Sequence, residues 1–559
     1  MSFRSLRNFR RLGYGAVAIG SFFVADNTLN YSTFTRDLRT LVAGAILSVD
    51  YKLNFQPGEG RVEGVHQRAS KLILDTCLQN GGLFIKFGQQ IASLNHVLPP
   101  QYVQTFKVLY DEAPHVDYAA VEKIFKEEFN KTPLEMFATF DEVPIASASI
   151  AQVHRATLQD GTQLAVKVQK PYIKVQMYWD LQTYKLLVFL FEKLFDIPLY
   201  WSADYIIQQV KKEADFINEA ANAEKCKAQI LQEPRLRERV HVPKAYHDLT
   251  STRVLTAEWI EGVKFGDVAR LKSEGYDVEE TMTTCVEVFA DQIFKSGFVH
   301  CDPHVGNMLV RRHPQTKKQQ LVLLDHGLYV QAEDVFRHNY CLFWKSLFTG
   351  DIPSMERIAQ SWGIRDVQML ASSTLQRPWS PGKTIHSGDQ RPSAKELFDM
   401  QVQAKERVKH FMKDTELLPK ELIFIGRNLN LVRSNNKNFG SPVNRVNIMA
   451  DWAVRGLGDS WSLWDRNMKL SNDNSKALVA SRQSNTIGFF VVSRMNYYLF
   501  KSSLFVASTV FYFQRWLQFI RGQIWGNPGA GFEDLLDQEM RVALEAQFGI
   551  KIDPSAFDA

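Results

Sequence analysis

The sequence contains few cysteines, and they form no pattern. Five of its 559 residues are cysteine, widely spaced and without a CxxC pair: Cys77, Cys226, Cys285, Cys301 and Cys341. An odd number of distant cysteines supplies neither a disulfide framework nor the ligand spacing of a structural zinc site. The sequence therefore favours a reducing or neutral compartment.

The sequence also lacks a charge excess. It has 66 Lys and Arg residues against 61 Asp and Glu, a surplus too small to indicate a nucleic-acid-binding surface. A mean hydropathy of -0.22 argues against a polytopic membrane protein. The chain is much longer than the ~250–300 residues at which one hydrophobic core stops growing, so we expect more than one packed lobe.

The N-terminus is basic and then apolar. Its first twelve residues, MSFRSLRNFRRL, include four arginines, and no acidic residue precedes Asp26, as in mitochondrial presequences. Gly13 to Ala25 is apolar but shorter than the ~20 residues that span a bilayer. A secretory signal and a helix that packs on the fold are the alternatives. The arginine spacing and unpaired cysteines favour a presequence and short apolar anchor over residues 1–25.

Two other apolar stretches are also too short to span a membrane. Leu41 to Val49 is predicted to form a buried helix. Ile487 to Ile520 is rich in aromatic residues, but cations interrupt it, so its longest uncharged run is Ser502 to Gln514. A helix in the core of the last lobe is the favoured interpretation, and an amphipathic helix in a membrane interface is the alternative.

Between the ends, helical patterns surround a region of strand character. Helices are expected at residues 62–95, 117–130, 173–196 and 203–232. Strands at residues 151–158 and 162–169 flank Asp160-Gly161, a turn typical of a hairpin. Further strands are expected at 254–259 and 321–324, and a surface loop at 372–393. The pattern predicts a small antiparallel sheet followed by a larger helical lobe.

The segments FVHCDPHVGNMLV (298–310) and LVLLDHG (321–327) carry the clearest chemical pattern. Asp302 and Asn307 are five positions apart, and Asp325 follows at the end of an apolar strand. This is the spacing of a kinase-type phosphoryl-transfer site, which needs a carboxylate near the attacking oxygen and hard oxygen ligands for magnesium. Two histidines four apart, His300 and His304, are expected to shape the loop rather than bind zinc, and Cys301 is expected to pack.

A lysine precedes this set in kinase order. Lys167 lies in the second hairpin strand, from which an ammonium reaches nucleotide phosphates, and the helix at 203–232 offers carboxylate partners. Glu213 and Glu219 are six positions apart, which corresponds to about 240° around one helix, so they should face different neighbours.

Several motifs in order resemble the aarF-domain (ABC1, UbiB) atypical kinases, most of all the mitochondrial aarF-domain-containing kinase 1 branch and its fungal relatives. They are KFGQ at Lys86 to Gln89, IASASIAQVH at Ile145 to His154, Glu213-Ala-Asp215, Glu219, HCDPHVGN at 300–307 and Asp325-His-Gly327. Val305 departs from the family's usual proline.

The resemblance implies a role for each matching residue. Lys167 would pair with Glu219 and contact phosphates, Asp302 would take the catalytic-base position, and Asn307 and Asp325 would hold Mg²⁺. The remaining implied positions are a nucleotide loop (Ala146, Ser147, Ala148 and Ser149) and a regulatory motif that covers the cleft (Lys86, Gln89, Glu213 and Asp215).

The resemblance also implies an α+β, bilobal protein-kinase-like fold. A helical N-terminal extension with the KxGQ motif (26–135) would precede an N-lobe with a small antiparallel sheet (136–262). A larger helical C-lobe (263–460) would be followed by a C-terminal helical region (461–559), with membrane-interfacial contact as one alternative for it.

The function implied is an ATP- and magnesium-dependent atypical kinase or ATPase, with protein kinase activity left open. It would be associated with the mitochondrial inner membrane, peripherally or through a single anchor, and act in lipid or isoprenoid-quinone homeostasis and membrane organisation. Lipids or isoprenoids as substrates and mitochondrial membrane proteins are the expected partners. Two alternatives remain: a catalytically silent nucleotide-binding scaffold, and a soluble small-molecule phosphotransferase, which KFGQ and the Glu213/Glu219 pair disfavour.

Overall fold

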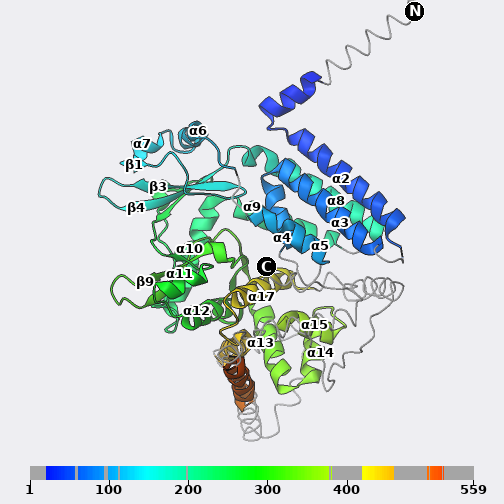
Figure 1. Cartoon of the computed structure of the whole chain (residues 1–559), viewed down its shortest axis with the longest axis vertical. Helices are drawn as coiled ribbons and strands as arrows, with labels where there is room; N and C mark the ends of the chain where they lie inside the picture. The colour runs from blue at the N-terminus through cyan, green and yellow to red at the C-terminus, as the bar shows by residue number, and fades with distance from the viewer. Residues whose placement is uncertain are drawn as a thin grey trace, which may run out of the picture.

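The computed structural model describes residues 20–56, 61–92, 99–110, 114–196, 199–376, 379, 418–458, 500–502, 504–518 and 520. These residues form a bilobal, kinase-like α+β fold in which a small sheet lies above a helical lobe and a helical extension lies beside both (Figure 1). Residues 1–19 of the expected presequence and apolar anchor, and most of the expected surface loop, lie outside the described residues. Residues 372–375 of that loop belong instead to helix α15 (Val367–Leu375).

The N-lobe is built on one antiparallel sheet, with strand order β1-β3-β4-β6 and β2 paired to β3. The hairpin expected around Asp160-Gly161 is confirmed, because β3 and β4 pair throughout their length. Helices α6 and α7 contribute apolar side chains to the cluster that packs against this sheet. The bounds are β1 Thr139–Phe140, β2 Ala146–Ser147, β3 Ala151–Thr157, β4 Gln163–Gln169, β6 Val254–Glu258, α6 Tyr118–Phe129 and α7 Pro133–Met136.

The C-lobe holds the largest hydrophobic cluster of the described chain, formed mainly by helices with two small sheets at its upper edge. Its helices are α11 Val268–Ser273, α12 Val278–Asp291, α13 Asp334–Thr349, α14 Ile352–Ser361, α15, α17 Glu421–Asn438 and α18 Arg445–Gly458. Its strands are β5 Val240–His241, β7 Val263–Lys264, β8 Phe298–His300, β9 Met308–Arg312, β10 Gln319–Leu323 and β11 Tyr329–Gln331. A one-turn 3₁₀ helix, η4 (Val305–Asn307), leads into β9.

The extension combines helices from two parts of the chain. Helix α8, which follows β4, packs along α2, and α9 packs on α8 (Figure 1). The helices are α2 Thr33–Asn54, α3 Arg61–Asn80, α4 Leu83–Ala92, α5 Pro100–Phe106, α8 Ile173–Phe195 and α9 Tyr200–Glu213, while α10 (Phe216–Gln232) enters the N-lobe. No helix of the described residues is long and apolar enough to cross a membrane.

Two helices expected to be continuous are each divided. Gly81 and Gly82 both have positive φ, at 66° and 54°, which ends α3 and starts α4. The expected helix at 203–232 breaks after Glu213, because the Asp215 side chain accepts a hydrogen bond from Ile217 N and caps α10. The angle expected between Glu213 and Glu219 on one helix was therefore wrong, although the two residues do have different partners.

The prediction that Leu41 to Val49 forms a buried helix was wrong about burial. This stretch lies within α2, but Val42 is 49% and Ile46 53% exposed. Near the other end of the chain, residues 500–502 and 504–518 are helical; Phe500 and Leu504 pack into the C-lobe cluster while Phe505 and Phe513 are exposed. The contacts of Phe500 and Leu504 agree with the favoured interpretation of a core helix, whereas the membrane-interface alternative stays a prediction. Residues 487–499 of this stretch lie outside the described residues.

Candidate active site

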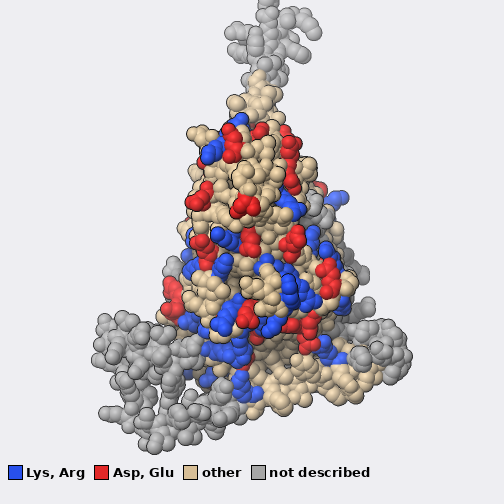
Figure 2. Space-filling view, turned by 90° about the vertical axis from the view of Figure 1, so that its left-hand side faces the viewer, with Lys and Arg blue, Asp and Glu red and all other residues tan. Residues whose placement is uncertain are grey.

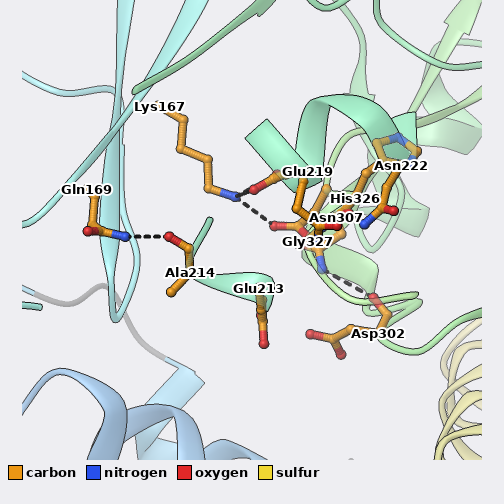
Figure 3. A network of polar contacts seen from close by, with 12 residues as sticks. Lys167, Gln169, Glu213, Ala214, Glu219, Asn222, Asp302, Asn307, His326 and Gly327 are labelled. Carbon is orange, nitrogen blue, oxygen red and sulfur yellow. Dashed lines mark hydrogen bonds and ion pairs between the residues drawn. The ribbon is translucent and has the colours of Figure 1, made fainter. Parts of the chain in front are cut away.

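The centre of the site is an ion-pair cluster between the lobes. Lys167 on β4 places its Nζ 2.8 and 2.9 Å from the two carboxylate oxygens of Glu219 and 3.1 Å from Oδ2 of Asp325. Glu219 lies in the first turn of α10, and Asp325 follows β10. Figure 3 shows the Lys167 side chain extending from the sheet toward Glu219. The structure thus joins the expected lysine, helix glutamate and strand-end aspartate.

Burial and charge act in opposite directions in this cluster. Burial alone would lower the pKa of Lys167, but the carboxylates of Asp325 and Glu219 outweigh it and raise that pKa. For Asp325 burial would raise the pKa, yet Lys167 and the Gly327 N–H lower it. Asp325 is therefore ionised over the physiological range, as an oxygen ligand for a cation must be.

His300 joins the two loops that carry the acidic residues. Its Nδ1 accepts a hydrogen bond from Asp302 N at 2.9 Å, and its Nε2 donates to the carbonyl oxygen of Asp325 at 3.0 Å. One nitrogen accepts and the other donates, which is the pattern of a neutral imidazole, and burial lowers the pKa of His300 accordingly. The expectation that this histidine shapes the loop agrees with these contacts.

Asp302 and Asn307 lie together on the loop after β8. Asn307 donates from Nδ2 to the carbonyl oxygen of Asp302 at 3.2 Å (Figure 3). The Asp302 carboxylate contacts Arg427 on α17, with Nη2 to Oδ1 at 2.9 Å. Burial would raise the pKa of Asp302, but Arg427 and then Lys86 lower it. Sequence reasoning missed Arg427, because it lies 125 positions from Asp302 and no local motif marks it.

Lys86 on α4 reaches the cleft from the extension and forms an ion pair with Glu213, the last residue of α9. Its side chain is 13% exposed, and burial lowers its pKa to about 8 although Asp302 and Asp325 act to raise it. An ammonium so close to both acidic residues occupies the side of the cleft nearest α4.

The other residues of the cleft-covering motif have structural partners. Gln89 donates to the carbonyl oxygen of Leu109, and Asp215 caps α10 instead of contacting Lys86. Gly88 packs closely on the next segment: a Cβ there would lie 2.1 Å from Leu109 Cδ1. Gln89 and Gly88 therefore fix the position of α4, while Lys86 contacts the cleft.

The alanine-rich loop that begins at Ala146 lies one strand away from Lys167 in the sheet. Val153 of β3 pairs with Ala146 on one side and with Lys167 on the other. Ser147 donates from Oγ to Pro114 O, and Ser149 is buried. A second lysine that the sequence did not reveal, Lys170, donates to the carbonyl oxygens of Ala148 and Pro114 at 2.6 and 2.8 Å. Lys170 thereby fixes the loop close to the sheet.

The described residues favour a hard cation at this site. Asp302, Asn307 and Asp325 offer carboxylate and amide oxygens, the donors that Mg²⁺ prefers. Within the described residues no group of three His, Cys, Asp or Glu side chains is placed to hold a metal by itself, so other oxygens, such as those of nucleotide phosphates, would complete the shell. All five cysteines are buried and free, and burial raises the pKa of the Cys301 thiol, which fits a packing role.

Comparisons with known proteins identify the family of this chain. Residues 108–359 match the model of the ABC1 atypical kinase-like domain. An ABC1 family protein of Schizosaccharomyces pombe is 38% identical to this chain, over 80% of this chain and 83% of that protein. The chain belongs to the ABC1 family.

Other ABC1 relatives carry kinase names. AarF domain-containing protein kinase 1 of Mus musculus is 33% identical over 76% of this chain and 82% of its own length. A probable serine/threonine-protein kinase, abkD, of Dictyostelium discoideum is 37% identical over 77% of this chain and 62% of its own length. Among solved structures, the erythromycin complex of Rv3197 from Mycobacterium tuberculosis gives a TM-score of 0.40 at 20% identity, covering 66% of this chain and 87% of that one.

Proposed function

We propose that the protein is an ATP- and magnesium-dependent atypical kinase or ATPase. The observation that carries the proposal is the cluster of Lys167, Glu219 and Asp325, with Asp302 and Asn307 on the adjacent loop. Lys167 would hold the phosphates, and Asn307 and Asp325 would hold Mg²⁺, which neutralises charge on the transferred group when bound. Asp302 would accept the proton of the attacking oxygen.

The acceptor is proposed to be a small molecule or lipid rather than a protein. The ion pair between Lys86 and Glu213 places α4 against the cleft, on the side of Asp302 and Asp325. An extended protein segment would have to displace this buried pair, and breaking a buried ion pair costs about 3–5 kcal/mol. A compact hydroxyl or phosphate acceptor needs less space.

A mitochondrial setting is proposed from the basic start of the sequence. Four arginines and no acid occur in the first twelve residues, which supports import. From the resemblance to the mitochondrial aarF-domain branch, the proposal extends to association with the inner membrane. It also includes a role in lipid or isoprenoid-quinone homeostasis and membrane organisation, with mitochondrial membrane proteins as partners. Mass spectrometry of small molecules that co-purify with the full chain, before and after addition of ATP and Mg²⁺, tests this part. A lipid or isoprenoid whose mass increases by one phosphate supports it.

The chemistry is tested by replacing one ligand. Wild-type protein is expected to show ATP turnover and a rise in melting temperature with ATP and Mg²⁺, and Asp325→Asn should lose most of both. Asp334→Asn is the matched control, because Asp334 begins α13 with its side chain 86% exposed and is paired only with Arg337 among the described contacts. Equal nucleotide responses in wild type and Asp325→Asn would contradict the proposal.

One observation supports a nucleotide-binding scaffold as the second candidate. The carboxylate expected to act as base, Asp302, is already paired with Arg427. A null strain carrying Asp302→Asn separates the two functions. Full rescue would show that the chemistry is dispensable, while failure to rescue, with nucleotide binding retained, favours catalysis.

A further inference from the structure

Helix α2 has the reverse of the usual polarity for a surface helix. A helix on a protein in water normally buries its apolar side and exposes polar residues. In α2 the buried side chains are mostly polar or small: Thr33, Arg36, Thr40, Ala43 and Ser48. The large exposed side chains are apolar, with exposed fractions from 43% to 64%: Phe34, Leu38, Val42, Ile46, Val49 and Leu53. Exposed polar side chains are confined to the last turn of α2, at Lys52 and Asn54.

Helix α8 runs parallel to α2 and repeats this pattern. The two helices touch at pairs with a nearly constant separation along the sequence: Tyr31 with Tyr172, Arg36 with Asp180, Gly44 with Leu187, and Tyr51 with Phe195. The exposed side chains of α8 are again mostly apolar or aromatic: Val175, Tyr178, Trp179, Leu186, Phe189, Leu190 and Leu194. We call the two exposed sets together the α2/α8 face; the helices lie side by side in Figure 1.

The contact between the helices resembles packing inside a membrane protein. Arg36 and Asp180 form an ion pair at 3.0 Å with side chains 4% and 0% exposed, and Arg36 also donates to the carbonyl oxygen of Asn80. A Cβ on Gly44 would lie only 2.7 Å from Leu187, so glycine allows close approach here. Small and polar residues between helices, with large apolar residues outside, are typical of helices that face lipid.

We infer that the α2/α8 face docks on a lipid bilayer and inserts its apolar side chains into the interface. Three features favour lipid over a protein partner. First, no charged side chain is exposed on α2 between Phe34 and Val49, because Arg36 is buried and Asp37 and Arg39 are partly buried. Charged groups at the rim normally fix the register of a protein partner, whereas lipid needs none.

Second, three of the four exposed aromatic side chains of the face, Phe34, Tyr178 and Trp179, lie toward one end of it, and Phe189 lies further along α8. Tyr178 and Trp179, each 55% exposed, lie one turn or more past exposed Lys174, an arrangement suited to lipid headgroups. Third, the apolar surface continues toward the N-terminus, where residues 20–29 are helical and Phe22, Phe23 and Val24 are exposed. Residues 20–25 of this helix belong to the segment that the sequence predicts to be an apolar anchor.

Docking on lipid does not depend on the nucleotide chemistry proposed above, so Asp325→Asn should dock normally. The five native cysteines are buried, which allows a single surface cysteine to be labelled with an environment-sensitive fluorophore in the full chain. Ile46→Cys reports on the α2/α8 face, and Lys126→Cys, at an exposed position of α6, is the control. Val506→Cys reports on the exposed apolar side of the helix at residues 504–518, called the C-terminal helix below. The probe is a phosphatidylcholine vesicle, with and without cardiolipin.

The label at Ile46 should brighten and shift to the blue with vesicles of either composition, and lipid-borne quenchers should reach it, while the label at Lys126 should not respond. This readout reports contact at Ile46 even if the N-terminal segment also binds lipid. A response at Val506 without one at Ile46 would overturn the proposal in favour of the C-terminal helix. A response at Ile46 that depends on protein concentration without vesicles would overturn it in favour of a second copy.

Substitution of the face gives a second measurement. The double variant Val42→Asn with Ile46→Asn should weaken vesicle binding at least about tenfold, because two apolar side chains that would be buried in the bilayer interface are replaced by polar ones. Val506→Asn with Phe513→Asn is the matched control and should leave binding unchanged. All four side chains are exposed, so circular dichroism should show folded proteins. A label at Leu38→Cys in the Val42/Ile46 variant reports whether the face still contacts vesicles. If this variant binds vesicles as tightly as wild type and the label at position 38 does not respond to them, the proposal is overturned.

Discussion

The charged side chains of the cleft are held by one another before any ligand is bound. Lys167 shares its single positive charge between Glu219 and Asp325, while Arg427 pairs with Asp302. Because each acid has a cationic partner, the cleft holds several charges without the large cost of an isolated buried ion. A cation that binds Asp325 must compete with Lys167 for Oδ2. This ion pair therefore lowers the affinity of the site for the cation.

The ion pair of Lys86 with Glu213 gives a test of stability. Lys86→Met should destabilise the protein by roughly 3 kcal/mol, because the Glu213 carboxylate, with its side chain 10% exposed, is left without its partner. Adding Glu213→Gln should recover most of the loss, since no buried charge remains. Chemical denaturation of the two single variants and the double variant measures the coupling; a double variant as unstable as the sum of the singles would contradict the prediction.

Arg427 should control the pH at which Asp302 acts. Its positive charge lowers the pKa of Asp302 against the effect of burial. Without it that pKa rises, so the carboxylate becomes protonated at a higher pH and can no longer accept a proton. Arg427→Gln should therefore move the acid limb of the pH profile of ATP turnover upward by about one unit, whereas Arg427→Lys should move it less. Coinciding acid limbs for wild type and Arg427→Gln would contradict this role.

At the scale of helices and strands, the sequence predicted elements well where the signal is local. The hairpin at Asp160-Gly161 and the order Lys167, Asp302, Asn307 and Asp325 were legible from turn chemistry and spacing. Contacts between distant segments were not: Arg427 reaches Asp302 from α17, and Lys170 fixes the alanine-rich loop through carbonyl oxygens. The exposed apolar side of α2 was not predicted for the same reason. The length of an apolar stretch indicates a helix, but it does not show which side of that helix other elements cover.

Gly88 allows α4 to pack closely against the segment that follows it. A Cβ at this residue would lie 2.1 Å from Leu109 Cδ1 and 3.1 Å from Phe106 Cδ1. Gly88→Ala should force α4 away from the following segment, with a cost of about 1–3 kcal/mol, and should alter the nucleotide-dependent thermal shift, because Lys86 is on the same helix.

A substitution at Leu109, which contacts Gly88, should compensate for Gly88→Ala. Leu109 is buried, and Leu109→Ala removes the atom that obstructs the new methyl group. The double variant Gly88→Ala with Leu109→Ala should regain part of the thermal shift that Gly88→Ala loses, even though Leu109→Ala alone creates a cavity. If the double variant is no better than Gly88→Ala in both denaturation and thermal shift, close packing does not explain the glycine.

At the scale of the whole molecule, the two lobes and the extension meet around the cleft. The N-lobe contacts the C-lobe through Lys167 and Asp325 and through Asn222, which donates to the carbonyl oxygen of His326 at 3.0 Å. The extension reaches the same point through Lys86, whose ammonium interacts electrostatically with Asp302 and Asp325. Figure 2 shows positive and negative side chains interspersed over one face of the molecule, in keeping with the nearly balanced composition.

Global stability should depend on pH through Asp291, the last residue of α12. This residue is 4% exposed, and burial, aided by Glu233, raises its pKa to about 7 against the opposing charge of Lys295. Between pH ~4, where the unfolded chain loses this proton, and pH 7, the folded state keeps a proton that the unfolded state releases.

The free energy of unfolding should therefore fall as pH rises through that window, by up to about 1.4 kcal/mol per pH unit from this group alone. Asp291→Asn resembles the protonated form at every pH, so the variant should match wild type near pH 4 and be the more stable protein at pH 8. Denaturation of both proteins at these two pH values measures the difference. Glu356→Gln, an exposed change on α14, serves as the control for loss of one negative charge; an equal gain at pH 8 from that control would assign the effect to net charge instead of to the buried carboxylate.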